Sequence, residues 1–401
     1  MEWKEVRLGD VVEIVNGFAF KSKAFTLEGI PVIKIKNIKA GKVILNDLDY
    51  ISTSDINPKY TKIRSSDILI TMTGNRMDGS PETWVGKVSL FRHQGDFYLN
   101  QRVSALRLID DSVDNNFLSY YLSSWQSQLY FALNSNSSGG QANITPAVVQ
   151  EYRLMVPELE TQRSIASILS SLDRKIELNN KINADLEEMA QAIFKNWFVD
   201  FEPFKDGKFV DSELGMIPEG WKVGGLFDIA EIFDKKRKPL SGNVREKMDK
   251  IYPYYGATSC MDYVDDYIFD GIYTLIGEDG SVVKENGLPY MQYVWGKMWV
   301  NNHAHILQGK NGYSTEMIHA LLSITNIKFL VTGAVQAKLS QGNMQKILVA
   351  IPPKNVLDEI RPVIDNLYSK IRINTDENSR LSLLRDTLLP RLMSGELEVP
   401  E

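Results

Sequence analysis

The sequence contains one cysteine, Cys260, among its 401 residues. A single thiol can form neither an internal disulfide nor a multi-cysteine metal site, so we expect the reducing cytoplasm as its location. No uninterrupted apolar run reaches the about 18 residues that a membrane span needs. The first five residues also lack the basic and then apolar pattern of a signal peptide, so no membrane association is expected.

The sequence also lacks the excess of positive charge that is common in nucleic-acid-binding proteins, since its net charge is −6. A DNA surface would therefore need local patches, or completion by partner subunits. Residues 21–42 hold six lysines and one acid, and residues 234–250 hold seven basic side chains and three acids. Both patches lie at the same relative place in two copies of an internal repeat. This favours phosphate contacts, over solvated loop lysines, for Lys21, Lys23, Lys34, Lys36, Lys39, Lys235, Lys236, Arg237 and Lys238.

The repeat is clearest toward the end of each copy. Residues 141–145 (QANIT) return as residues 336–340 (QAKLS), and this offset of 195 holds without a gap for more than 50 residues. The beginning of each copy also returns, because Trp3-Lys4 matches Trp221-Lys222 at an offset of 218. Between these ends the copies diverge. Two copies of one scaffold that carry different binding surfaces would have this pattern.

Short apolar runs separated by Gly, Asn, Asp and Pro predict that each copy is a β-rich α+β domain followed by a long helix. Residues 201–220 are rich in proline and glycine and read as a linker. We therefore predict five segments: a domain over residues 1–157, a helix over 158–200, a linker over 201–220, a domain over 221–353 and a helix over 354–395.

Both predicted helices carry a regular stripe. From Ile165 to Trp197, and again from Ile360 to Leu392, mainly apolar residues recur in alternating steps of four and three. More than four heptads of this kind are typical of a coiled coil, and the alternative is an amphipathic helix that lies on its own domain. Both stripes are interrupted by asparagine at the same two places, which favours the coiled coil.

Buried asparagines commonly fix the register of paired helices. In an antiparallel pair related by a pseudo-twofold axis, Asn179 would face Asn378 and Asn183 would face Asn374. Each helix, at about 33 residues, would be on the order of 50 Å long. The pair would then act as a ruler that holds two reading domains at separate sites on DNA, at least about one helical turn apart.

Three segments resemble those of one known family. Residues 191–203 (QAIFKNWFVDFEP) and 211–221 (DSELGMIPEGW) are similar to the central conserved region of the specificity subunits of type I restriction–modification systems. Residues 301–307 (NNHAHIL) resemble a strand that is common in the recognition domains of that family. The resemblance covers essentially the whole chain.

This resemblance implies an α+β fold, in which two β-rich target recognition domains in a pseudo-twofold arrangement are joined by two long conserved helices that form an antiparallel coiled coil. It implies a subunit that reads a bipartite, asymmetric target in double-stranded DNA. The implied protein partners are two methyltransferase subunits and the restriction subunits, which carry translocase and nuclease activity. S-adenosylmethionine, ATP and Mg²⁺ are expected in those partners and not in this chain, and the methylated base in the family is typically adenine.

One loop is a candidate for reading bases. It follows residues 68–70 and contains Asn75 and Arg76, and its counterpart in the second copy is residues 277–281. Arginine pairs well with a guanine edge and asparagine with an adenine edge. An ordinary Gly-Asn turn is the alternative. The segments that begin at Gln141 and Gln336 are alike in the two copies, which suits backbone contacts better than base reading.

An enzyme that methylates or cuts DNA by itself is the main alternative function. The sequence has no P-loop, no dinucleotide motif and no Pro-Pro-aromatic motif. Asp67, Glu82 and Lys87 imitate a nuclease cluster, but such scattered residues are common by chance. His303, His305 and Cys260 lack a fourth metal ligand, so we expect no metal site and no catalytic residue. A purely structural coiled-coil protein would leave the divergent middles of the copies unexplained.

Overall fold

The computed structural model describes residues 3–77, 80–138, 140–333 and 336–399. The chain forms two compact units: unit 1 comprises residues 1–177 and 378–401, and unit 2 comprises residues 178–377. The boundaries fall inside both long helices, so each unit holds one β-rich domain together with parts of both helices. None of the helices in the described part of the chain is both long and apolar enough to cross a membrane.

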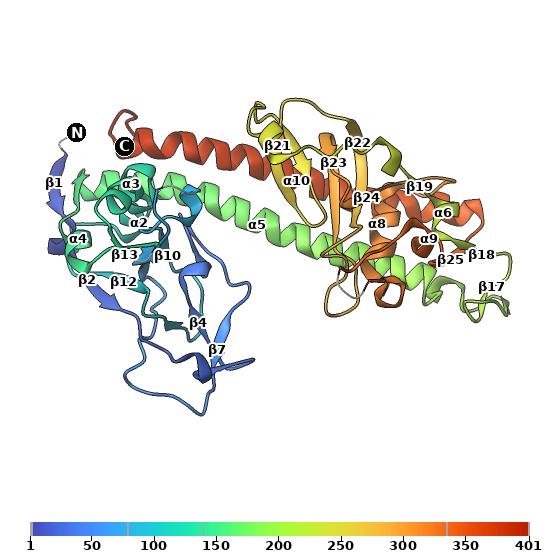
Figure 1. Ribbon diagram of the computed structural model, residues 1–401, viewed down its shortest axis with the longest axis horizontal. Coiled ribbons are helices and arrows are strands. Elements are labelled where there is room, and N and C mark those ends of the chain that lie inside the picture. The colour runs from blue at the N-terminus through green and yellow to red at the C-terminus, as the bar shows by residue number, and fades with distance from the viewer. Residues whose placement is uncertain (1–2, 78–79, 139, 334–335, 400–401) are drawn as a thin grey trace. The chain divides into compact units, whose positions relative to one another are not determined.

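Unit 1 is built on an antiparallel four-stranded sheet with the order β10-β8-β12-β2. A second sheet has the order β11-β4-β7-β3, and a small sheet has the order β13-β14-β9. The strands are β1 (Lys4–Arg7), β2 (Val12–Asn16), β3 (Phe25–Thr26), β4 (Ile30–Ile33), β5 (Ile38–Lys39), β6 (Lys42–Val43), β7 (Asp49–Ile51), β8 (Ile68–Thr71), β9 (Thr73–Gly74), β10 (Val88–Leu90), β11 (Tyr98–Leu99), β12 (Val103–Leu108), β13 (Asn136–Ser138), β14 (Gln141–Asn143) and β15 (Arg153–Val156) (Figure 1). The short helices are α1 (Leu8–Val11), α2 (Asn115–Ser123), α3 (Trp125–Leu133) and α4 (Pro146–Gln150).

Unit 2 is built on a six-stranded sheet with the order β19-β24-β22-β23-β20-β21. Its first three strands correspond to the first copy's β2, β12 and β8. The strands of the unit are β16 (Phe209–Val210), β17 (Ile217–Pro218), β18 (Lys222–Gly225), β19 (Ala230–Ile232), β20 (Tyr252–Tyr255), β21 (Cys260–Val264), β22 (Phe269–Gly277), β23 (Met291–Val300), β24 (Ala304–Gly309) and β25 (Leu348–Ile351). The short helices are α6 (Leu226–Ile229), α7 (Gly242–Arg245), α8 (Thr315–Ile324) and α9 (Gln341–Met344).

The two ends of each repeat meet in a two-stranded sheet. In unit 1, β1 pairs with β15 so that Lys4 lies opposite Val156. In unit 2, β18 pairs with β25 so that Lys222 lies opposite Ile351. Lys222 is the equivalent of Lys4 at the offset of 218, and Ile351 is the equivalent of Val156 at the offset of 195. The strands therefore pair in the same register in both copies. The internal repeat predicted from the sequence is therefore also a structural repeat.

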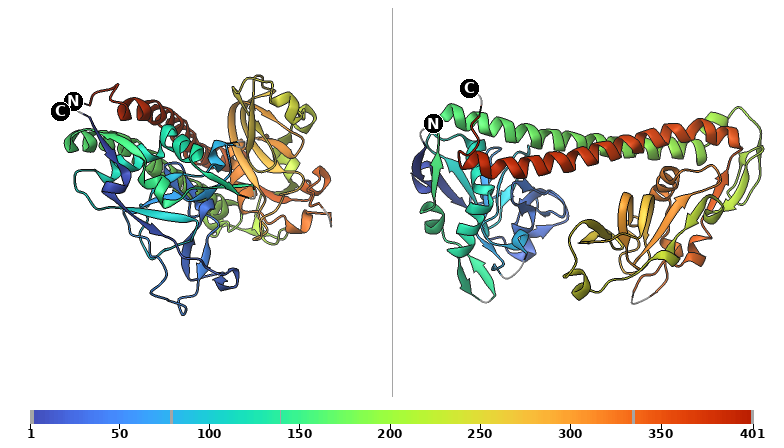
Figure 2. Two further views of the ribbon diagram at one scale, coloured as in Figure 1. Left: turned by 60° about the vertical axis from the view of Figure 1, so that its left-hand side comes forward. Right: turned by 90° about the horizontal axis from the view of Figure 1, so that it is seen from above.

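The predicted long helices are α5 (Leu159–Phe198) and α10 (Lys354–Met393), each of 40 residues. At about 1.5 Å per residue each is about 60 Å long, longer than the sequence indicated. In each unit the two helices lie side by side and run antiparallel, since Arg385 contacts Asp173 at 2.8 Å in unit 1 and Asn374 contacts Asn183 at 2.9 Å in unit 2 (Figure 2). Every stripe position from 165 to 197 and from 360 to 392 is buried or half-buried.

The ends of the helices also belong to the cores of the units. Ile165 and Leu169 pack with Leu392 in the main core of unit 1. In unit 2, Phe194 and Tyr368 belong to the main core, although neither residue lies on the predicted stripe. The two interpretations of the helices therefore both hold: they pair with each other, and they lie on their own domains.

The four stripe asparagines have different surroundings. The amide of Asn374, which is 1% exposed, donates to Asn183 Oδ1, which is the pair predicted from the sequence. Asn183 in turn donates to Thr375 Oγ1 at 3.2 Å, and Asn179 donates to Glu377 at 2.8 Å. A buried amide destabilises a helix pair unless it is bonded, so these contacts support a role in register. The pairing of Asn179 with Asn378 stays a prediction, because the two belong to different units.

The segment 201–220 is more ordered than a linker. Helix α5 ends where Phe201 adopts a left-handed conformation (φ 54°), and Phe201 and Ile217 are buried in the core of unit 2. Strands β16 and β17 form a hairpin over the same core. The proline and glycine content correctly indicated turns, but it did not reveal the apolar anchors between them.

Candidate nucleic-acid interface

The candidate reading loop of unit 1 is held by the segment that begins at Gln141. Strand β9, at the start of the loop, pairs with β14, and Thr73 Oγ1 donates to Asn143 Oδ1 at 2.8 Å. The amide of Ile144 donates to the carbonyl of Met72 at 3.0 Å. Two segments that the sequence singled out separately thus lie side by side.

Unit 2 uses the same backbone framework for its own loop. The amide of Leu339 donates to the carbonyl of Glu278 at 2.8 Å, as Ile144 does to Met72. The amide of Glu278 donates to the carbonyl of His303 at 2.8 Å, as Met72 does to Arg102 at 2.9 Å. The frame is therefore shared, whereas the side chains that it presents differ.

Asn75 and Arg76 both project from this frame in unit 1. Both side chains are exposed, and the loop is anchored through the backbone, because the amide of Asn75 donates to the carbonyl of Thr83 at 2.9 Å. Within residues 3–77, 80–138, 140–333 and 336–399, neither side chain makes a hydrogen bond or an ion pair. A rigid base with free polar side chains is what base reading requires, so both remain candidates.

The lysine patch of unit 1 divides into two groups. Lys21 and Lys23 are exposed. Lys34 contacts Asp49 at 2.9 Å, and Lys36 contacts Asp47 at 2.7 Å and Asp49 at 3.3 Å. The hydrogen bond from Asp47 raises the pKa of Lys36.

The charge of Lys34 and Lys36 is therefore balanced within the unit, and phosphate contacts for these two lysines stay a prediction. The acids that balance it lie just beyond the 21–42 window in which charge was counted. Strand β7 carries Asp49 back beside β4, where it lies opposite Val32.

The basic patch of unit 2 also divides. Lys235, Lys236 and Lys238 are exposed, whereas the side chain of Arg237 is only 12% exposed. Arg237 donates to Glu278 at 2.5 Å, to the carbonyl of Ala304 at 2.8 Å and to the carbonyl of Asp234 at 3.0 Å. These bonds give Arg237 a structural role, and its contact with a DNA phosphate stays a prediction.

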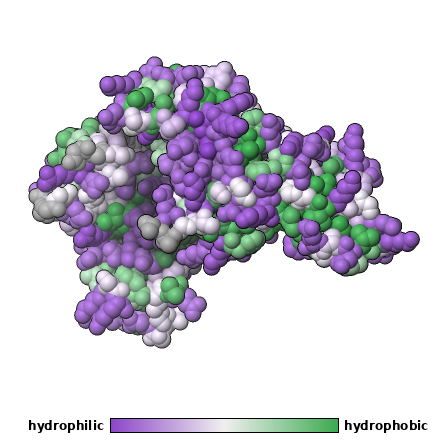
Figure 3. All heavy atoms as spheres, turned by 45° about the vertical axis from the view of Figure 1, so that its right-hand side comes forward, coloured by the Kyte–Doolittle hydropathy of each residue, from purple (hydrophilic) through white to green (hydrophobic). Residues whose placement is uncertain are grey.

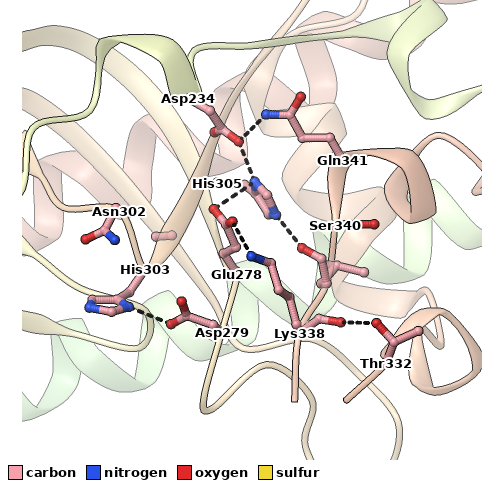
Figure 4. A network of polar contacts seen from close by, with 12 residues as sticks. Asp234, Glu278, Asp279, Asn302, His303, His305, Thr332, Lys338, Ser340 and Gln341 are labelled. Carbon is pink, nitrogen blue, oxygen red and sulfur yellow. Dashed lines mark hydrogen bonds and ion pairs between the residues drawn. The ribbon is translucent and has the colours of Figure 1, made fainter. Parts of the chain in front are cut away.

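Arg237 belongs to a network of buried charges near the reading loop (Figure 4). His305, which is 1% exposed, contacts Asp234 through Nδ1 at 2.5 Å and the carbonyl of Leu339 through Nε2 at 2.7 Å. Each ring nitrogen therefore faces one oxygen of the protein. Burial opposes the ionisation of Asp234, but the hydrogen bond and charge of His305 outweigh it and lower the pKa of Asp234.

The same residues resemble a metal site, because ligand atoms of Asp234, Glu278 and His305 lie within 4.8 Å of one another. The site already holds cations of the protein. Arg237 bonds to Glu278, and Lys338 lies 3.5 Å from the other oxygen of that carboxylate. Both His305 nitrogens are also engaged. The arrangement therefore suits an internally neutralised cluster, and Cys260, whose thiol contacts the carbonyl of Asp262, is not part of it.

Unit 1 has a neutral counterpart of this cluster. Asn16 and Ser104 are the equivalents of Asp234 and His305, and Ser104 donates to Asn16 at 2.9 Å. The repeat thus keeps a polar link between the same two strands and changes its charge.

The acids and the lysine that imitate a nuclease have different surroundings. Asp67 is bound by both ends of the Arg107 guanidinium, at 2.8 and 3.0 Å. Glu82 is exposed, and Lys87 is buried beside the base of the reading loop. The backbone of Lys87 is bonded to Thr71 at the base of the reading loop.

The family model described as the type I restriction modification DNA specificity domain matches residues 1–188 and again residues 218–383. The chain belongs to this family. The two matches correspond to the two copies, and both reading loops lie inside these specificity domains.

Two curated relatives of these specificity domains align along the whole chain. The specificity subunit of the type I restriction enzyme MjaIX from Methanocaldococcus jannaschii is 26% identical, over 100% of this chain and 94% of its own length. That of HindI from Haemophilus influenzae is 24% identical, over 99% and 100%. The crystal structure of the type I S subunit from M. genitalium, 17% identical, covers 100% of this chain and 97% of its own with a TM-score of 0.57. This last likeness supports the fold.

Proposed function

We propose that this chain is the DNA-reading subunit of a type I restriction–modification complex, and that each unit reads one half of a bipartite, asymmetric target in double-stranded DNA. The proposal rests on one observation: the two units share the same backbone frame and present different side chains from it. Unit 1 presents Asn75 and Arg76 there. Unit 2 presents Asp279 and His303, which contact each other at 2.5 Å. Unlike readers imply unlike half-sites.

Substitution of Arg76 tests this assignment. Arg76→Ala should cost about 1–3 kcal/mol at one base pair of one half-site and leave the other half-site unchanged. The measurement is the affinity for a panel of duplexes that each differ from the target at one position. Lys21→Ala is the matched control, since loss of a phosphate contact weakens all duplexes equally. An equal loss on every duplex for Arg76→Ala would contradict base reading.

We also propose that the chain has no chemistry of its own. Methylation and cleavage belong to partner subunits, two methyltransferase and the restriction subunits, which would bring S-adenosylmethionine, ATP and Mg²⁺. In support, the acids that imitate a nuclease or a metal site, Asp67 and the Asp234–Glu278 pair, are bound to Arg107 and Arg237. Turnover of S-adenosylmethionine by the isolated chain would overturn this proposal.

A hollow in unit 2 is the surface that we assign to the methyltransferase partner. Phe194, Phe198 and Tyr313 line it, and the exposed side chains of Leu214 and Leu348 border it. Figure 3 shows hydrophobic surface at the right-hand end, where Figure 1 labels β17 and β25. Exposed apolar patches of this kind mark interaction sites.

A charge placed in this patch should prevent assembly. Leu214→Asp is expected to reduce co-purification of the methyltransferase subunit at least about tenfold, because the carboxylate would have to be desolvated. Leu27→Asp, at a side chain that is 99% exposed in unit 1, is the control. Equal recovery of the methyltransferase with both variants would exclude the patch.

A further inference from the structure

We propose that Lys87 and Lys39 form a notch at the base of the reading loop of unit 1 that binds one backbone phosphate of DNA. This inference rests on the proposed function and adds a residue to it. Lys39 is one of the predicted phosphate contacts, whereas Lys87 is not. The pair would fix the position of the DNA strand beside the bases that Arg76 reads.

The first observation is a lysine whose side chain is largely buried and whose amine has no acidic partner. Lys87 is 5% exposed, and in the described ranges no carboxylate lies within ion-pairing distance of its amine. Its neighbour Lys39 carries the same sign of charge. Burial, together with Lys39, lowers the pKa of Lys87 to about 8, and the charge of Glu82 opposes this shift. A largely buried lysine with no acid beside its amine would be stabilised by a ligand that supplies the opposite charge.

The second observation is the position of the two lysines. The hairpin of β5 and β6, which carries Lys39, is held against β10 because the amide of Gly41 donates to the carbonyl of Val88 at 2.8 Å. Lys87 directly precedes Val88. Segments almost 50 positions apart in the sequence thus bring the two lysines close enough for the charge of Lys39 to act on Lys87.

The third observation is the link to the reading loop. The backbone of Lys87 is bonded in both directions to Thr71: its amide donates to Thr71 Oγ1 at 3.0 Å, and its carbonyl accepts from the amide of Thr71 at 2.9 Å. Two residues earlier, the amide of Val85 donates to the carbonyl of Asn75 at 3.3 Å. Lys87 and the loop therefore share one rigid support, and a phosphate bound by Lys87 would be held at a fixed distance from Arg76.

Unit 2 does not repeat the notch. The strand registers place Val88 opposite Ile70 and Met291 opposite Ile276, so the equivalent of Lys87 is Tyr290. The notch therefore belongs to the variable part of the frame, and the phosphate contact should lie only beside the half-site that unit 1 reads.

The test uses Lys87→Met and Lys39→Ala in the full chain assembled with its methyltransferase subunits. Each variant should weaken binding by about the same factor on the target and on duplexes altered in either half-site. Each should also make the negative slope of log affinity against log salt shallower by about 0.9, the value for one phosphate. Ethylation of one phosphate beside the half-site of unit 1 should impair the unaltered complex and not the Lys87→Met complex. Lys4→Met is the control for the change in net charge.

The melting temperature of the free chain separates binding from structure. Lys87→Met should raise it, because the unpaired buried charge is removed. A lower melting temperature with an unchanged salt slope would show that Lys87 is structural and would overturn the notch. Lost discrimination at one base pair with an unchanged slope would also overturn it, while the proposed function would stand. Absence of sequence-specific binding by the unaltered complex would instead refute the proposed function.

Discussion

Arg237→Met is expected to destabilise unit 2 by about 3–5 kcal/mol, the cost of removing one partner from a buried ion pair. The Arg237 guanidinium donates to Glu278 and to three backbone carbonyls, and it lies 3.4 Å from the carboxylate of Asp234. Without it, the cluster would hold two carboxylates against His305 and the more distant Lys338. The measurement is the free energy of unfolding from urea denaturation, followed by a probe within unit 2.

Lys235→Met is the matched control for this variant. Lys235 is exposed two positions earlier and should change stability by less than about 0.5 kcal/mol. Its loss should instead weaken DNA binding, since it is one of the phosphate contacts that remain predicted. A loss below about 1 kcal/mol for Arg237→Met would show that the cluster does not need its cation.

A seven-residue insertion in register in both long helices should lengthen the unread spacer and leave both half-sites unchanged. Seven residues add about 10 Å to a helix, which corresponds to about three base pairs at 3.4 Å each. A whole heptad keeps the apolar stripe on the same face of each helix, so the pairing is preserved. The original target should then be bound at least about 100-fold more weakly than a duplex with the longer spacer.

The insertion points follow from the structure. The unit boundaries, after Glu177 in α5 and after Glu377 in α10, separate the parts of each helix that pack on different cores. The control carries the insertion in α5 alone, which should break the register and abolish binding to both duplexes. A variant with both insertions that prefers the original spacer, or that reads different bases, would contradict the role of the helices as a ruler.

The parts of the fold that depend on local pattern were predictable from the sequence. The repeat offsets of 218 and 195 matched Lys4 with Lys222 and Val156 with Ile351, and the strands pair in that register. The heptad stripe indicated that the helices pair, because burial on one face of a helix depends only on spacing, and the family resemblance implied the antiparallel direction. The Asn183–Asn374 contact followed from the same geometry.

The ion pairs were not predictable, because they join positions that are distant in the sequence. A count of charge over 234–250 treated Arg237 as a free cation, but its main partner, Glu278, is 41 positions away. Lys36 is balanced by Asp47, only 11 positions away, yet that acid lies outside the counted window. A count of charge over a short window thus overestimated the free positive charge of both segments.

The burial of Lys87 has a weak signal in the sequence. Lys87 precedes the apolar strand β10, and a lysine in such a place is rarely buried without a partner. Only the strand pairing shows that it supports the reading loop and not a nuclease cluster.

Mapping every methylated position in the genome of a host that carries this chain with its methyltransferase subunits would test the central claim most directly. Two short, different groups of fixed bases, one methylated adenine in each group and on opposite strands, separated by a constant stretch of unread bases, are predicted. A single uninterrupted block of recognised bases, or two identical groups, would contradict the conclusion that one duplicated frame holds two unlike readers.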